Sequence, residues 1–244
     1  MAVQVVPEPG ISGNLFLDAL PRASSARLIE HLERIETPSG ASIARAGEAI
    51  EYAVFPISCV VSSVARMRDG SDLEVALIGR EGFYGIPMVL GGNISATEAM
   101  VQIPNALFRM KSTDFEDCLR ADEPLREQSL RYVQAMIDTI GQFAACNRLH
   151  PINERCARWL LMAHDRVPGD EVFLTHEFLA TMLGVRRPGV SIAAAALEAA
   201  GLIEYHRGRI VVKNRTGLEQ AACECYAFAN DALDRLLGYN VRKR

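Results

Sequence analysis

Residues 175–215 carry side chains that suit contact with a nucleic acid. Arg186 and Arg187 stand directly before Pro188, a residue that favours the first turn of a helix. Arginine binds phosphate oxygens and guanine edges, and Ser191, one turn further on, can hydrogen-bond to a base edge or a phosphate. The spacing leaves open which arginine would contact a base and which a phosphate.

A second basic group lies in a predicted β-hairpin. The apolar and polar residues alternate over 202–206 and 210–212, and these segments flank Arg207-Gly208-Arg209. Between residues 175 and 216 there are six basic and three acidic side chains, a local charge of +3 in a chain whose formal net charge is −4. Because phosphate neutralisation dominates affinity for nucleic acids, this local charge favours a DNA-binding surface. The predicted DNA-binding residues are Thr175, Arg186, Arg187, Ser191, His206, Arg207 and Arg209.

Two short helices and a hairpin are needed to position these residues. Thr175 is a good N-cap for a first helix, which Gly184 would end, and a second helix is predicted from Pro188 to Ala200 with Gly201 as its cap. A helix, a tight turn, a helix and a hairpin with a basic tip predict a winged helix-turn-helix, whose second helix enters the major groove.

The N-terminal half has a different pattern. A short helix is expected around residues 22–35, and over 37–110 short Val- and Ile-rich runs alternate with glycines, which predicts a β-roll or barrel. Its clearest element is a hairpin of 60–67 and 73–78 around Asp69-Gly70. We therefore predict an α+β protein, with a β-roll over 14–120, a long helix within 121–150, and a winged helix-turn-helix with an extra C-terminal helix over 151–244.

The long helix is predicted from Leu125 to Leu149, where His150-Pro151 breaks it. Apolar residues within it are spaced by three and four, as in a coiled-coil seam. This favours a parallel homodimer, and the alternative is a helix buried within its own chain. The predicted dimer-interface residues are Val133, Met136, Ile140, Phe143 and Asn147.

Composition and motifs exclude several classes of protein. No run of about 20 apolar residues could cross a membrane, and the start lacks the features of a secretory signal, so we expect a cytoplasmic protein. The six cysteines are scattered and show neither a disulfide framework nor a zinc spacing, so no metal and no cofactor are expected, and the role of Cys223 and Cys225 is open. Nucleophile-elbow, phosphate-loop and metalloprotease motifs are missing, so we expect no enzyme.

The chain resembles the bacterial regulators typified by the cyclic-AMP receptor protein and FNR, from about residue 14 to 216. This resemblance implies a cyclic-nucleotide-binding-like β-roll, a dimer helix, and a homodimer that binds pseudo-palindromic double-stranded DNA to regulate transcription, with RNA polymerase as a candidate partner. It also implies that Arg187 reads a base and that Pro188 replaces a base-reading glutamate, so we expect a different operator. The motif that carries the resemblance is Thr175-x-x-x-Leu179-Ala180-x-x-Leu183-Gly184-Val185-x-Arg187-x-x-Val190, then Leu197-Glu198-x-x-Gly201-Leu202-Ile203.

The effector region departs from this family. Cyclic-nucleotide binders clamp the phosphate with an arginine and the ribose with a glutamate, whereas the stretch 83–99 has no arginine and carries Ile86-Pro87 in place of the acidic turn. A buried phosphate without a cation is poorly compensated, so we expect regulation independent of cyclic AMP, with any small-molecule effector unidentified. The alternative is an effector-like module that binds a protein partner instead of DNA.

Overall fold

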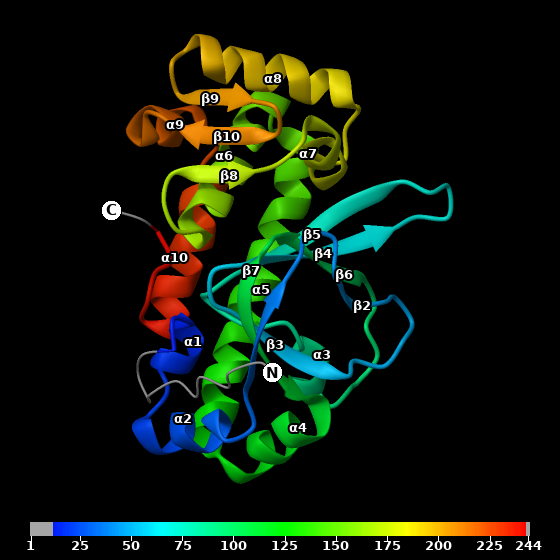
Figure 1. Cartoon of the computed structure of the whole chain (residues 1–244), viewed down its shortest axis with the longest axis vertical. Helices are drawn as coiled ribbons and strands as arrows, with labels where there is room; N and C mark the ends of the chain where they lie inside the picture. Colours follow the sequence, from blue (N-terminus) through cyan, green and yellow to red (C-terminus); the bar gives the residue numbers. More distant parts are fainter. Residues whose placement is uncertain (1–11, 243–244) are drawn as a thin grey trace.

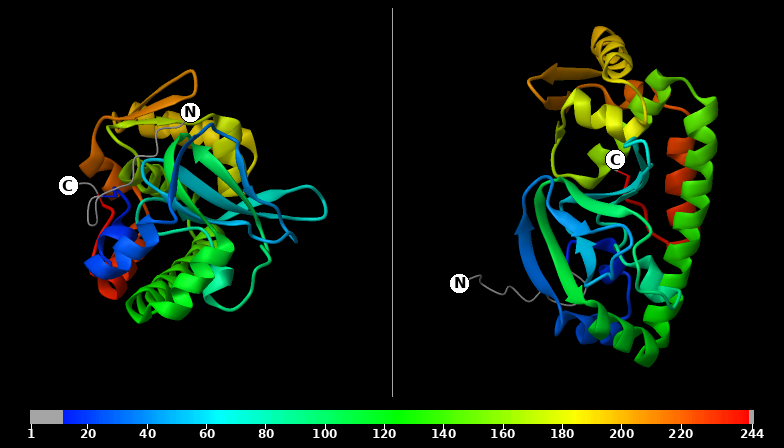
Figure 2. Two further views of the ribbon diagram at one scale, coloured as in Figure 1. Left: turned by 60° about the horizontal axis from the view of Figure 1, so that its bottom comes forward. Right: turned by 90° about the vertical axis from the view of Figure 1, so that its right-hand side faces the viewer.

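The structure, a computed structural model, describes residues 12–242. The predicted C-terminal domain therefore extends by two residues, 243–244, outside the described part of the chain. A long helix, α5 (Glu123–Leu149), runs from the N-terminal β-roll to the C-terminal helices (Figures 1 and 2). No helix among the described residues has both the length and the apolar content needed to cross a membrane.

The N-terminal half is a roll of two antiparallel sheets, as the glycine-punctuated runs predicted. One sheet has the order β1-β7-β3 and the other the order β2-β6-β4-β5. The predicted hairpin is confirmed, because β4 pairs with β5 on either side of Asp69-Gly70. The strands are β1 (Glu33–Thr37), β2 (Ser42–Ala44), β3 (Tyr52–Pro56), β4 (Val60–Arg66), β5 (Asp72–Ile78), β6 (Glu98–Ile103) and β7 (Asn105–Lys111).

Short helices close the roll, and they include one correction. The predicted first helix ends at Ile29, and Ile35 lies in β1, where it pairs with Leu107 of β7. Its helical spacing from Leu28 and Leu32 was therefore coincidental. The helices are α1 (Leu15–Asp18), α2 (Arg22–Ile29), α3 (Ile86–Val89) and α4 (Ser112–Ala121).

Aromatic side chains fill the core of the roll. Phe83 is in contact with Phe16 at 4.9 Å, with Phe115 at 5.2 Å and with Tyr132 at 5.0 Å between ring centroids. Tyr132 comes from α5, so the long helix is anchored in the roll by a fully buried ring. A Cβ added at Gly82 would lie 2.1 Å from that ring, so only glycine fits there.

The end of α5 at Leu149 agrees with the sequence-based prediction, and the helix begins at Glu123, before the predicted Leu125. The side chain of Asp122 accepts a hydrogen bond from the backbone N–H of Leu125, which caps the first turn, and Pro124 occupies that turn. The helix ends at Leu149, because His150 precedes Pro151 and is extended. From there α6 (Ile152–Arg166) begins the C-terminal half.

The C-terminal half is a winged helix-turn-helix on a three-stranded sheet of order β8-β10-β9. The predicted two helices and the hairpin are all present (Figure 1). The elements are β8 (Glu171–Phe173), α7 (His176–Leu183), α8 (Arg187–Ala199), β9 (Ile203–His206) and β10 (Arg209–Val212).

The end of the chain differs from the single extra C-terminal helix that the sequence predicted. Two helices are present, α9 (Arg215–Ala221) and α10 (Cys225–Leu237), because Ala222 is extended and interrupts the helical backbone. The break lets α10 pack along α5 (Figure 2). The chain then returns to the roll, where the hydroxyl of Tyr239 donates to the carbonyl of Glu81 at 2.7 Å and Val241 is buried.

A buried ion pair joins the two halves. The guanidinium of Arg166, at the end of α6, lies 2.9 Å from the carboxylate of Glu81, and both side chains are almost fully enclosed. Glu81 also accepts the backbone N–H of Gly79 at 3.0 Å. A Cβ at Gly79 would lie 2.6 Å from the Arg166 side chain, so the loop and the helix are in close contact.

Candidate nucleic-acid interface

The turn between α7 and α8 has the geometry of a helix-turn-helix. Thr175 caps α7, since its Oγ1 accepts the backbone N–H of Phe178 at 3.2 Å. Gly184 ends α7 in the left-handed conformation, with φ +61°. The N–H of Val185 then donates to the carbonyl of Ala180 at 3.0 Å, and the half-buried Val185 packs on the C-terminal core.

The outward face of α8 combines charge with an apolar centre. Arg186 and Arg187 are both exposed at its N-terminal end, and Arg187 Nε lies 3.8 Å from a carboxylate oxygen of Glu177. Ile192, one turn beyond Pro188, is 72% exposed. Sequence reasoning missed Ile192, although its spacing of four from Pro188 places it on the reading face. An isolated exposed isoleucine beside two arginines suits contact with a thymine methyl group.

Ser191 is partly engaged within the protein. Its hydroxyl lies 3.1 Å from Nδ1 of His176, and the His176 ring stacks on Tyr205 of the wing at 4.1 Å between centroids. Burial, and then the charge of Arg187, lower the pKa of His176, so this ring is neutral at pH 7. The interaction joins α7, α8 and β9 beneath the reading face and orients the Ser191 hydroxyl.

The wing tip is a two-residue turn. Arg207 has φ +49° and Gly208 has φ +82°, which is the pair of left-handed residues that a strand-matched hairpin turn requires. Both His206 and Arg207 are exposed. Arg209 instead interacts with β8, where it pairs with Glu171 and lies over the Phe173 ring at 5.3 Å. A phosphate would have to share Arg209 with that carboxylate.

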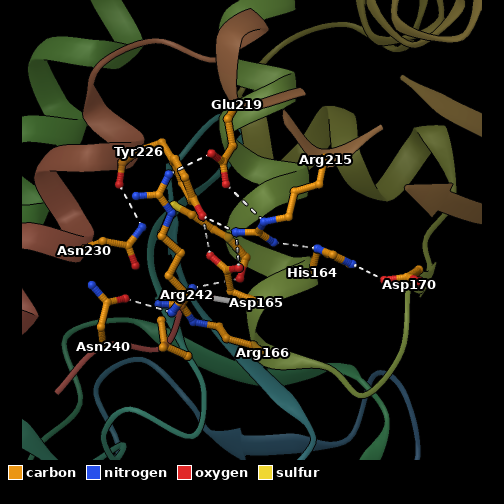
Figure 3. Close-up of polar contacts among 12 residues, drawn as sticks. His164, Asp165, Arg166, Asp170, Arg215, Glu219, Tyr226, Asn230, Asn240 and Arg242 are labelled. Carbon is orange, nitrogen blue, oxygen red and sulfur yellow. Dashed lines mark hydrogen bonds and ion pairs between the residues drawn. The ribbon is translucent and has the colours of Figure 1, made fainter. Parts of the chain in front are cut away.

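A polar cluster joins α6, α9 and α10 in the C-terminal half (Figure 3). The carboxylate of Asp165, fully buried in α6, accepts from Arg215 at 2.7 Å and from the Tyr226 hydroxyl at 2.7 Å. Arg215 Nη1 also donates to Nδ1 of His164 at 2.8 Å, so the other ring nitrogen carries the proton that bonds Asp170 at 2.9 Å. These contacts fix α9 and α10 against α6.

The predicted dimer-interface residues do not share one outward face. Val133, Met136 and Phe143 are buried within their own chain, because α10 and the core of the roll cover that side of α5. Asn147 accepts a hydrogen bond from Arg155 at 3.1 Å. Ile140 is exposed.

The stretch 83–99 forms α3 and the loop into β6. The Tyr84 hydroxyl lies 2.6 Å from the hydroxyl of the buried Ser95. All residues of this stretch are described in the structure, and none of them is an arginine or lysine that could pair with a phosphate.

Residues 154–221 match the family model of the Crp-like helix-turn-helix domain. A comparison with curated proteins finds no match.

Solved structures share the architecture of more than three quarters of the chain. FixK2 from Bradyrhizobium japonicum superposes with a TM-score of 0.67 at 18% identity, over 79% of this chain and 98% of FixK2. TTHB099, a CRP-family transcriptional regulator from Thermus thermophilus, gives a TM-score of 0.64 at 20% identity, over 77% and 96%. The c-di-GMP-responsive global regulator CLP from Xanthomonas campestris gives 0.62 at 17% identity, over 79% and 99%. The chain therefore carries a Crp-like helix-turn-helix domain and has the fold of the CRP/FNR transcription regulators.

Proposed function

We propose that the chain is a homodimeric transcription regulator that binds a pseudo-palindromic DNA site without cyclic AMP. The observation that carries the proposal is the exposed end of α8, where Arg186, Arg187 and Ile192 stand together beside the exposed wing residue Arg207. This combination offers cations for phosphates and guanine, and an apolar contact for thymine.

The contacts divide by chemistry. Arg187 and Ile192 read base edges, whereas Arg207 and the hydroxyl of Thr175 bind phosphates. The Thr175 oxygen accepts a bond as the α7 cap, so its proton is available to a phosphate oxygen. Pro188 stands in the first turn of α8 with no side-chain acceptor. It therefore makes no hydrogen bond to a cytosine amino group.

The dimer forms through the face of α5 that its own chain leaves open. That face carries Leu130, Ile137 and Ala144, spaced by seven, with Ile140 beside them. A seven-residue repeat is the spacing of a helix pair. Two chains joined in this way present two α8 helices, about 34 Å apart if they follow one turn of DNA.

Selection of bound sequences from random duplex DNA tests this function. Wild-type protein without added ligand should enrich an inverted repeat, and Arg187→Ala should lose it. Arg45→Ala is the matched control, because Arg45 is similarly exposed but lies in the β-roll, next to Glu48. No enrichment by the wild type, with or without cyclic nucleotides, would contradict the proposal.

The salt dependence of binding separates the roles of the two arginines. A lost phosphate contact lowers affinity for all sequences and reduces the slope of log K against log salt by about 1. A lost base contact costs about 1–3 kcal/mol at one operator position and relaxes the preference there. We expect the first result for Arg186→Ala and the second for Arg187→Ala.

A further inference from the structure

Four side chains with metal-binding atoms meet where α5 ends and α10 begins. Cys146 and His150 lie one turn apart at the end of α5, and Cys223 and Cys225 flank Glu224, the residue directly before α10. Their sulfur and nitrogen atoms all lie within 4.8 Å of one another, and the three cysteines are buried. The chain brings them together from positions about eighty residues apart, which is why the linear spacing showed no zinc motif.

The distances match the edges of a tetrahedral site. Sγ of Cys146 lies 3.6 Å from Sγ of Cys223, and Sγ of Cys225 lies 3.7 Å from Nδ1 of His150. A tetrahedral zinc ion with Zn–S bonds of about 2.3 Å and a Zn–N bond of about 2.1 Å has S···S edges of about 3.8 Å and S···N edges of about 3.6 Å. The donor set, three cysteines and one histidine, is one that structural zinc sites use.

Outer contacts orient two of the four donors. Nε2 of His150 lies 3.2 Å from a carboxylate oxygen of Glu224, so this nitrogen carries the proton and Nδ1 presents its lone pair to the cluster. Nε2 of Gln142 donates to Sγ of Cys225 at 3.2 Å, as a donor to a thiolate does. Such carboxylate–histidine and donor–thiolate contacts are typical of the surroundings of bound metals.

The charged side chains around the cluster also suit a zinc ion with three thiolate ligands. Three thiolates and a divalent cation have a net charge of −1, which needs a cation nearby when buried. Arg158 and Arg155 are buried in α6, and both are close enough to Cys146 for an electrostatic interaction. The guanidinium of Arg158 lies 4.0 Å from the ring centroid of Phe143, one turn before Cys146.

We propose that Cys146, His150, Cys223 and Cys225 bind one structural Zn²⁺ ion. All four positions are protein ligands, so the site is closed and no position is open for catalysis. The ion joins α10 to the last turn of α5, directly before the junction with α6. It thereby fixes the long helix where the DNA-binding domain begins. This inference stands on the cluster alone and does not depend on DNA binding.

Metal analysis of the full-length protein, purified under reducing conditions without chelators, tests the site. We expect one zinc per wild-type chain and one per Cys118→Ser chain, since Cys118 is half-buried and lies outside the cluster. Cys225→Ser should lose the metal. Cobalt in place of zinc should give the absorption bands of a tetrahedral site and sulfur-to-cobalt charge transfer.

A surface variant keeps the test valid if Cys225→Ser does not fold. The side chain of Glu224 is 73% exposed, so Glu224→Gln should fold and weaken zinc binding about 10-fold in competition with a chelator. Removing zinc from the wild type should lower its Tm by about 5 °C or more, and zinc should restore it.

Two results would overturn the proposal. One is a wild type that carries no zinc and binds added zinc no more tightly than Cys225→Ser. The other is a Cys146–Cys223 disulfide, detected as a loss of two hydrogens by mass spectrometry, in freshly purified protein that still binds no zinc after reduction.

Discussion

The indole Nε1 of Trp159 donates a hydrogen bond of 2.8 Å to Oε1 of Glu74, and so joins α6 of the C-terminal half to β5 of the roll. The other oxygen of Glu74 lies 2.6 Å from the hydroxyl of Ser62, which also contacts the amide oxygen of Gln102. If Glu74 is protonated, its O–H donates to Ser62 and Ser62 donates to Gln102. Burial raises the pKa of Glu74 to about 7, which agrees with this arrangement.

Stability should therefore fall as the pH rises from about 4.5 to about 7. In this range folded Glu74 holds a proton that unfolded Glu74 has released, so the folded state binds more protons and the free energy of unfolding decreases with pH. Because the residue as a whole is only half-buried, we expect a loss of roughly 2 kcal/mol, below the value for a fully enclosed group. Denaturant unfolding at several pH values measures it.

Glu74→Gln serves as the comparison for that series. Glutamine can accept from Trp159 and donate to Ser62 without titrating, so the difference in unfolding free energy between wild type and variant should change through this pH range. A constant difference would show that Glu74 is ionised throughout.

Gly184→Ala should destabilise the protein by about 1–2 kcal/mol or more. The residue has φ +61°, and a Cβ there would lie 2.7 Å from Leu73 of the roll. Gly70→Ala is the matched control, since Gly70 has φ +84° but no heavy atom within 4 Å of the added carbon. Equal losses in the two variants would show that contact with Leu73 adds nothing to the cost of the backbone conformation.

Arg215→Met should lower the free energy of unfolding by about 3 kcal/mol, because it removes the ion pair between Arg215 and the buried carboxylate of Asp165. Arg242→Met is the control: Arg242 pairs with Glu219 at 2.7 Å but is 43% exposed, so its loss should cost less than about 1 kcal/mol. Thermal unfolding of both variants measures the two losses of unfolding free energy. A small effect of Arg215→Met would show that the cluster in Figure 3 is held together without that ion pair.

Ile137→Glu should dissociate the proposed homodimer. Ile137 is 58% exposed at the centre of the open face of α5, and a buried unpaired charge there should raise the dissociation constant at least about tenfold. Phe228→Glu, at an exposed apolar position on α10, should leave the association unchanged. Sedimentation velocity measures both, and dissociation by Phe228→Glu alone would place the interface on α10.

Much of the architecture could be predicted from local signals. Gly184 and Pro188 marked the turn between α7 and α8, and Pro151 marked the end of α5. The seam residues could not be assigned in this way, because the spacing of Val133 and Ile137 does not tell which of the two the rest of the chain covers. Part of that cover is α10, which begins after a break at Ala222 that no proline or glycine marks.

The candidate site could likewise be predicted only in part from the sequence. The exposed arginines of α8 and the wing were predicted from charge, whereas the pairing of Arg209 with Glu171 depends on the β8–β10 register. The cysteine cluster was missed because its two halves lie far apart in sequence. The spacing of four between Cys146 and His150, which places both on one helix face, was the signal available.

The return of residues 239–241 to the roll has a consequence for the order of folding during synthesis. The strands of the β-roll and of the winged domain are complete in sequence before α10 emerges from the ribosome. The contacts of Tyr239 with Glu81, and of Arg80 with the carbonyl of Val241, form only afterwards. A nascent chain halted before α10 would therefore join its two halves through the earlier contacts, Arg166 with Glu81 and Trp159 with Glu74, and would lack those of the C-terminal segment.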